Sequence, residues 1–141
     1  MLVRLLYVSR SVKPETAEET ESILNSSREH NISHGITGVL CFGGGIYLQA
    51  IEGGRHQVNA LYSQIIKDPR HKDVVILDYQ EITERRFGGW TMGQVRIDKL
   101  NPSIVLKYSE TPELDPYSVS GHVSFALLEE LMATASIVGR A

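Results

Sequence analysis

Hydrophobic and polar positions change their period along the chain, and these changes predict both strands and helices. Apolar runs rich in strand-forming residues, bounded by glycine, proline or polar clusters, predict strands at residues 2–9, 35–42, 46–53, 73–82 and 90–97. Proline near a first turn and apolar positions at helical spacing predict helices at about residues 15–30, 54–68, 102–109 and 117–137. Three glycines at 43–45 join the second and third strands into a hairpin.

The order of these elements predicts the fold class. The first six follow the pattern β-α-β-β-α-β, which is the ferredoxin-like arrangement, and a strand and two helices come after them. Right-handed crossovers would place the first two helices on one face of the sheet, with strands 2–9 and 46–53 adjacent at its centre. We therefore expect an α+β fold with a ferredoxin-like βαββαββ core at residues 1–97. Residues 98–141 are expected to form a helical extension that packs on the core or contacts a partner.

Two hydrogen-bonding side chains fall on these central strands. Tyr7 lies on the first of them and Gln49 on the third strand of the chain, each between apolar neighbours. A buried phenol or amide needs a polar partner, so the two either bond each other or the backbone within the core, or face a ligand. The inner stripe of the first helix is half polar, which favours a ligand between the helices; its residues are Ala17, Thr20, Leu24 and Ser27.

Further candidates lie just beyond the two helices. Asn31 follows the first helix, where it is expected in a turn. Asp68, Arg70 and His71 follow the second helix, either as a solvated turn or as a charged clamp for phosphate oxygens. The sequence has no spacing typical of a metal site. His30 and His34 lie on either side of the predicted end of the first helix, so they are not expected to share one face.

The last strand and the single thiol complete the set of candidate side chains. Trp90 and Met92, with Gln94, are expected on one face of the strand at 90–97. Cys41 lies in an apolar strand and is expected to pack as a small hydrophobic residue.

Composition and charge narrow the function classes. The chain has 141 residues and is 42% hydrophobic, which suits one soluble domain. Its 14 Lys and Arg against 17 Asp and Glu give a net charge of −3, which disfavours direct binding to nucleic acid. With one cysteine no intramolecular disulfide can form, and no run is long enough for a signal peptide core or a membrane span. We therefore expect a cytoplasmic protein.

Taken together, residues 2–97 resemble the BLUF family of blue-light sensors that use flavin. The resemblance rests on the LLYVSRS strand, the Asn31 turn followed by GITGVLCFGGGIYLQAIEG, then DPRHKDV, and then RRFGGWTMG. It implies a flavin, usually FAD, between the two helices with its ring over the central strands. The two-helix tail is similar to that of single-domain members, which act on a separate protein.

The resemblance also implies a role for each matching residue. Tyr7 would be the photochemical electron and proton donor, and Gln49 the amide that switches between it and the flavin ring. Asn31 would bond the carbonyl and imide edge of the ring, and Asp68, Arg70 and His71 would hold the ribityl and phosphate end. The other flavin-binding positions would be Ser27, His30 and Ile65, and the pair that carries the signal outward would be Trp90 and Met92.

The implied function is a photoreceptor without catalytic residues, in which light rearranges the hydrogen bonds around the flavin and causes a reversible red shift. Its output would pass through self-association or a separate effector, such as a cyclic-dinucleotide enzyme or a transcription regulator. Two alternatives remain open at this point: a flavin-dependent oxidoreductase and a flavin-free regulatory module on the same fold. A photoreceptor that forms a cysteine adduct is disfavoured, because nothing like the NCRFL motif surrounds Cys41.

Overall fold

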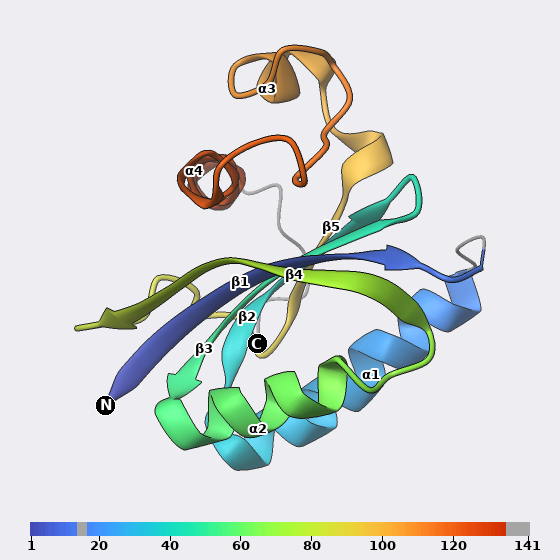
Figure 1. The fold of residues 1–141 in the computed structure, drawn as a ribbon. Helices are drawn as coiled ribbons and strands as arrows, with labels where there is room; N and C mark the ends of the chain where they lie inside the picture. The colour runs from blue at the N-terminus through green and yellow to red at the C-terminus, as the bar shows by residue number, and fades with distance from the viewer. Residues whose placement is uncertain (14–16, 135–141) are drawn as a thin grey trace.

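One mixed sheet divides the molecule into two layers (Figure 1). The computed structural model describes residues 1–13 and 17–134, and within them five strands pair in the order β4-β1-β3-β2-β5. The strands are β1 (Leu2–Ser11), β2 (Thr37–Gly43), β3 (Ile46–Gly54), β4 (His71–Ile82) and β5 (Gly93–Arg96). Only β5 runs parallel to its neighbour, β2. The helices are α1 (Ala17–His34), α2 (Arg55–Ile65), α3 (Pro102–Leu106) and α4 (Gly121–Ala133), with a short 3-10 helix η1 (Ile97–Lys99).

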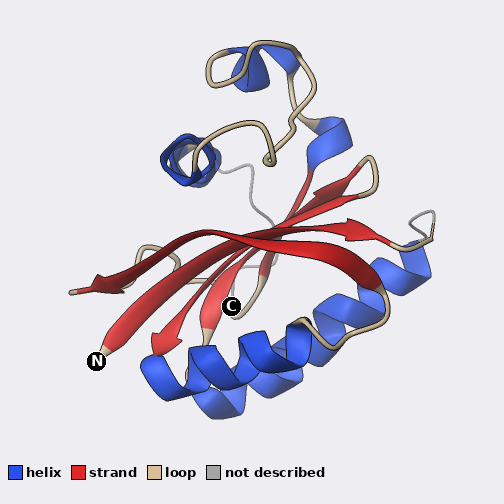
Figure 2. Ribbon diagram, in the orientation of Figure 1, coloured by secondary structure: helices blue, strands red, loops and turns tan. Residues whose placement is uncertain are grey.

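The arrangement confirms the predicted ferredoxin-like α+β fold. The strands β1 and β3 are antiparallel neighbours at the centre, and Tyr7 stands opposite Gln49 in their register. Helices α1 and α2 cover one face of the sheet, whereas α3 and α4 lie over the other face (Figures 1 and 2). Tyr7 lies on the face of the sheet that α1 and α2 cover, so these two helices bound the space next to Tyr7 and Gln49.

Strand alternation gives each face of the sheet its own hydrophobic core. Facing α1 and α2, the core includes Leu5, Leu24, Ile51, Val58 and Met92. Facing α4, it includes Leu6, Val8, Leu48, Leu127, Leu128 and Leu131. Because both faces are covered, the central strands are apolar at nearly every position, as expected for strands buried on both sides.

Helix α1 is longer than the sequence predicted. It continues to His34 and ends at Gly35, whose φ of +67° favours glycine, while the Ile36 N–H donates to the Asn31 carbonyl at 3.1 Å. The prediction that Asn31 lies in a turn after the helix is therefore wrong, because the chain does not reach a helix-ending residue until Gly35. His30 and His34 then share one helix face, and their rings stack 4.1 Å apart, contrary to the expectation that they would not.

The last strand is shorter than predicted, and this changes where two candidate residues lie. Residues 90–92 precede β5, and the Trp90 N–H donates to the Phe87 carbonyl at 3.1 Å in a tight turn. Trp90 packs in the core that faces α4, whereas Met92 is fully buried in the core that faces α1 and α2. The prediction of one shared face is wrong, because strict alternation holds only within a strand.

The C-terminal helices begin at side-chain caps. Asn101 accepts the Ser103 N–H at 3.0 Å, which confirms the predicted start of α3 at Pro102, although that helix ends at Leu106. Helix α4 begins at Gly121, four residues later than the predicted 117–137 helix, and Ser120 is its cap instead of Asp115. The last three residues of that predicted helix, 135–137, lie outside the described residues. Within the part of the chain that the structure describes, no helix is long and apolar enough to cross a membrane.

Candidate functional site

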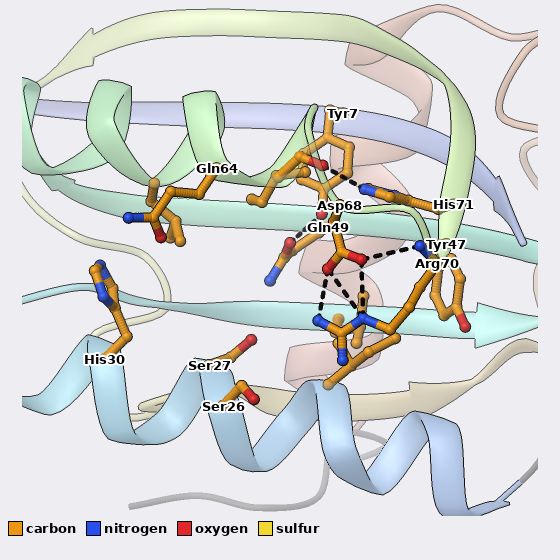
Figure 3. A pocket seen from close by; sticks show the side chains of 14 residues that line it. Tyr7, Ser26, Ser27, His30, Tyr47, Gln49, Gln64, Asp68, Arg70 and His71 are labelled. Atoms are coloured by element: carbon orange, nitrogen blue, oxygen red, sulfur yellow. Dashed lines mark hydrogen bonds and ion pairs between the residues drawn. The ribbon is translucent and has the colours of Figure 1, made fainter.

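A cavity opens between α1, α2 and the central strands (Figure 3). Its volume of about 150 Å³ is about ten times what one water molecule needs, which makes it a space for a larger ligand. Of the nine residues predicted to contact a flavin, eight line this cavity: Tyr7, Ser27, His30, Gln49, Ile65, Asp68, Arg70 and His71. The structure thus brings together side chains from the three strands β1, β3 and β4, from helices α1 and α2, and from the loop after α2.

The floor of the cavity is a chain of three buried side chains. The Tyr7 hydroxyl donates to Oε1 of Gln49, and Nε2 of Gln49 donates to Sδ of Met92 at 3.3 Å. Tyr7 and Gln49 are each 4% exposed, and Met92 is fully buried. Burial, and next the charge of Asp68, raises the pKa of the Tyr7 phenol, so the hydroxyl keeps its proton and acts as the donor in this pair.

Gln49 is the middle member of the Tyr7–Gln49–Met92 chain of hydrogen bonds, in which it accepts from one neighbour and donates to the other. Its amide offers an oxygen toward Tyr7 and an NH₂ group toward Met92. Exchanging the two ends of the amide would point the NH₂ group at the Tyr7 oxygen and the carbonyl at sulfur, which has no hydrogen to donate. The arrangement around Gln49 is therefore sensitive to any partner that bonds the amide from the cavity side.

Two buried polar atoms of α1 have no hydrogen-bond partner among the described residues: one belongs to His30 in the cavity wall, the other to Asn31, which is the one predicted flavin contact that does not line the cavity. Asn31 is fully buried and its Nδ2 donates to the Thr91 carbonyl at 2.9 Å, yet its Oδ1 accepts nothing. The Nε2 atom of His30, which lines the cavity, is likewise buried and without a partner. Burial, followed by the neighbouring His34, lowers the pKa of the His30 imidazole. Buried polar atoms are nearly always paired, so these two call for an external group.

The mouth of the cavity carries an ion pair. Nη2 of Arg70 lies 2.5 Å from Oδ2 of Asp68, and the Arg70 backbone N–H donates to Oδ1 at 2.9 Å, as Figure 3 shows. Partial burial raises the pKa of Asp68, but the hydrogen bonds and the charge of Arg70 outweigh it and leave the pKa below its usual value. The pair fixes the guanidinium of Arg70 at the cavity wall.

His71 joins the loop after α2 to the sheet. Its Nε2 lies 2.6 Å from the Ile65 carbonyl, and its Nδ1 lies 2.7 Å from Oγ of Ser9. Because a carbonyl can only accept, Nε2 carries a hydrogen, and in the neutral ring Nδ1 accepts from the Ser9 hydroxyl. Both nitrogens are thus engaged within the protein, and His71 lines the cavity without a free donor.

The sequence analysis missed part of the cavity wall, although the signals were present. The missed lining residues are Ile23, Ser26, Leu40, Tyr47, Leu61 and Gln64. Ile23 and Leu61 lie one helical turn before Ser27 and Ile65, Ser26 lies one turn before His30, and Tyr47 lies two residues before Gln49. Helical and strand periodicity point to these four positions. Trp90 does not line the cavity and lies on the far face of the sheet. Among the described residues no cluster of three or more His, Cys, Asp or Glu side chains could hold a metal ion.

Comparisons with known proteins agree with this geometry. The sequence profile of the BLUF family, sensors of blue light using FAD, matches residues 2–93. The blue light- and temperature-regulated antirepressor BluF of Escherichia coli K12 is 34% identical over 88 residues, which are 62% of this chain and 22% of that protein. Subunit beta of the photoactivated adenylate cyclase of Euglena longa is 33% identical over 92 residues, 64% of this chain but only 11% of the relative.

Two solved structures are similar over nearly their whole length. The BlsA photo-activated state superposes with a TM-score of 0.85 at 27% identity, covering 100% of this chain and 99% of that one. The dark-state structure of BlrB, a BLUF protein, gives a TM-score of 0.80 at 31% identity, covering 95% of this chain and 96% of that one. With the family profile matching well over half of its residues, the chain belongs to the BLUF family of blue-light sensors that use FAD.

Proposed function

We propose that this chain senses blue light through FAD bound in the cavity between α1 and α2, with Tyr7 and Gln49 as the photochemical pair. The observation that carries the proposal is the buried chain of hydrogen bonds from Tyr7 through Gln49 to Met92 at the floor of that cavity. It links a phenol, which is an electron donor, to an amide that can hold hydrogen bonds in more than one arrangement.

The residues present fit a flavin. The orphaned Oδ1 of Asn31 needs a donor such as the imide N–H of a flavin ring, and the buried Nε2 of His30 also lacks a partner. The apolar side chains Leu40 and Ile65 offer surfaces against which a flat ring can pack. At the mouth, Arg70 offers a cation suited to phosphate oxygens, held in place by Asp68. We assign Ser27 and His71 to the same wall on the basis of their position.

Bound FAD would supply a ring system that absorbs blue light and, once excited, accepts an electron. Tyr7 would be the electron donor, and Oε1 of Gln49, which the Tyr7 hydroxyl already contacts, would take up and return the hydroxyl proton. The amide of Gln49 would then be able to adopt a second arrangement of hydrogen bonds. A buried network has few fully satisfied states, so two such arrangements can be distinct and persistent. No covalent bond to the protein is formed or broken in the completed cycle.

We further propose that residues 1–97 form the sensory core and 98–141 the output extension, with Met92 and Trp90 carrying the change between them. Helix α4 packs against the face of the sheet opposite the cavity, which supports this division. The chain itself would be a cytoplasmic protein without enzymatic activity that acts by self-association or on a separate effector. An enzyme of cyclic-dinucleotide metabolism or a transcription regulator fits that role, since one similar solved structure is that of Klebsiella pneumoniae BlrP1 with cyclic diGMP and one relative is an antirepressor.

An absorption spectrum tests the proposal. The purified protein, reconstituted with FAD, is expected to show a small red shift after blue light that reverses in the dark. Gln49→Leu and Tyr7→Phe should abolish the shift while FAD still binds. Tyr79→Phe is the matched control, because Tyr79 is 41% exposed on β4 and outside the cavity. Bleaching to reduced flavin would point instead to an oxidoreductase, and failure to bind FAD would refute the proposal.

A further inference from the structure

The most completely buried charge on the far face of the sheet is the carboxylate of Glu52, which is 0% exposed. Its Oε2 accepts from Nε of Arg4 at 2.9 Å and from the backbone N–H of Arg86 at 3.0 Å, and its Oε1 accepts the backbone N–H of Phe87 at 2.7 Å. A charge this deep is tolerated only when it is paired and hydrogen-bonded. Glu52 therefore holds the start of the loop before β5 in one place.

Glu52 and its partner Arg4 lie on the same two strands, β3 and β1, as Gln49 and Tyr7. Arg4 stands opposite Glu52 in the register of β1 and β3, just as Tyr7 stands opposite Gln49 three residues away. An odd separation along a strand points the two sets of side chains to opposite faces. The Arg4–Glu52 pair thus lies on the α4 side of the sheet, directly behind the cavity floor.

The segment of residues 86–92 connects these two faces. Its start is bound by Glu52, while its end is bound from the cavity side, where Asn31 donates to the Thr91 carbonyl and Gln49 to Sδ of Met92. Between these ends, the turn from Phe87 to Trp90 is closed by a backbone hydrogen bond of 3.1 Å. A change in the hydrogen bonding of Gln49 therefore acts on a short segment that is fixed at its other end.

That fixed end contacts α4 through Phe87 and Arg86, and Arg4, the ion-pair partner of Glu52, contacts α4 as well. The ring of Phe87 meets the ring of Phe125 edge to face, with centroids 6.1 Å apart. Nη2 of Arg86 lies 2.6 Å from Oε2 of Glu129, and the guanidinium carbon of Arg4 lies 4.4 Å from the centre of the Phe125 ring. These contacts join α4 to the very residues that Glu52 positions.

We propose that Glu52 is the positioning residue for signal output. By holding the N–H groups of Arg86 and Phe87, it keeps the 86–92 segment from shifting as a whole when its other end is disturbed at Met92. A change at Met92 then moves the Phe87–Trp90 turn relative to α4. Without Glu52, the whole 86–92 segment would shift and α4 would not respond. The inference rests on the proposed function, since it takes a light-induced change at Gln49 as its input.

Glu52→Gln tests the inference with little change in volume. A glutamine has one oxygen to accept an N–H and an NH₂ group that cannot, so one of the two backbone bonds is lost. Glu81→Gln is the matched control, because Glu81 lies on β4 with a side chain 61% exposed and is paired with Arg55. Both variants and the unchanged chain, loaded with FAD, are measured in the dark and in blue light. The readouts are the red shift, its dark recovery rate, and hydrogen exchange of peptides from α4.

The unchanged chain and Glu81→Gln are expected to show a light-dependent change in the exchange of α4. Glu52→Gln should keep the red shift but lose at least half of that exchange difference, and its dark recovery rate should change several-fold. A merely structural role for Glu52 would lower stability without separating the red shift from the response of α4.

A surface variant keeps the test decisive if Glu52→Gln fails to fold. Arg86→Ala leaves the backbone bonds to Glu52 intact but removes the ion pair with Glu129, and its side chain is 51% exposed. It should reduce the light-dependent exchange difference in α4, whereas Arg55→Ala, with a side chain 44% exposed in the control pair, should not.

The two proposals fail in different ways. An absent red shift in the unchanged chain overturns the proposed function and this inference with it. A normal red shift without any light-dependent exchange in α4 overturns this inference alone. The same holds if Arg86→Ala and a folded Glu52→Gln both keep the full exchange difference.

Discussion

The hydrogen bond between Tyr7 and Gln49 can be isolated by a double-mutant cycle. Tyr7→Phe removes the donor and leaves Oε1 of Gln49 unpaired in a site that is 4% exposed. Gln49→Leu removes the acceptor, leaves the Tyr7 hydroxyl unpaired, and also removes the contact from Nε2 to Met92. The double variant removes both polar groups and leaves two apolar side chains facing each other, each similar in shape to the side chain it replaces.

The expected free energies follow from burial. Leaving one buried polar group unpaired costs about 1–3 kcal/mol, whereas replacing both partners by apolar groups is nearly neutral. Each single variant should therefore lower the free energy of unfolding by about 1–3 kcal/mol. The double variant should cost less than the sum of the two, with a coupling energy of about 1–2 kcal/mol.

Urea unfolding of the flavin-free proteins measures this coupling, since bound ligand would add its own stabilisation. Trp90 is the single tryptophan and lies in the core facing α4, so its fluorescence reports unfolding without touching the altered pair. Equal slopes against urea in all four proteins are required for the comparison. Costs that add within about 0.5 kcal/mol would show that the two side chains do not depend on each other and would refute the reasoning.

Three further predictions concern the wall of the cavity and the sheet beneath it. A Cβ at Gly38 would lie 2.1 Å from the Ala50 carbonyl oxygen, so Gly38→Ala should cost about 3 kcal/mol or more in urea unfolding; a cost below 1 kcal/mol would contradict the structure. Burial lowers the pKa of His30, so the unfolded chain binds more protons below about pH 6.5 and the flavin-free protein should lose stability as the pH falls toward 5. His30→Gln should flatten that slope in thermal unfolding, and an unchanged slope would exclude His30 as its source. The pKa of Asp68 is lowered by Arg70, so its stabilisation is present above about pH 4 and lost as the pH falls through the lower folded value. Asp68→Asn should remove that acid-dependent loss, and an identical acid profile would contradict the ion pair.

The centre of the fold was predictable because local and tertiary signals agree there. In β1 and β3 the side chains alternate between two buried faces, so the position of Tyr7 and Gln49 on the same face follows from strand periodicity and topology. For the segment after the proline-terminated helix the sequence left a solvated turn and a charged clamp open, and Asp68 and Arg70 do lie together in the cavity wall.

The sequence-based prediction failed at the boundaries of two elements, the start of β5 and the end of α1. Residues 90–92 read as the start of a strand, but their carbonyl groups accept hydrogen bonds from residues far away in the sequence: Trp90 from the Gly38 N–H and Thr91 from Asn31. Trp90 and Met92 consequently lie on opposite faces. Likewise α1 extends past Asn31, because the buried Asn31 side chain bonds the Thr91 carbonyl and the residue suited to end the helix, Gly35, comes four positions later.

Glu52 was not singled out because a carboxylate next to two glycines at the end of a strand is an ordinary sequence feature. Only the fold reveals that it is buried and that its partners come from β1 and from a loop more than 30 residues later. A charged residue in an otherwise continuous apolar strand was the available signal. Such a residue is rarely buried without being paired, so its place in that strand predicts a charged partner nearby.

The alternation of the central strands explains how a small domain can link a cavity to a helix on its far side. Three residues along a strand span about 10 Å, and an odd step reverses the face, so Gln49 and Glu52 serve opposite sides of one sheet within a short distance. Both sides are tightly packed, and packed interfaces respond to a local change by shifting to another arrangement more readily than by gradual deformation. The 86–92 segment touches both residues and both cores. A rearranged amide at the cavity floor can therefore reach α4 through a single short segment, without any movement of the sheet itself.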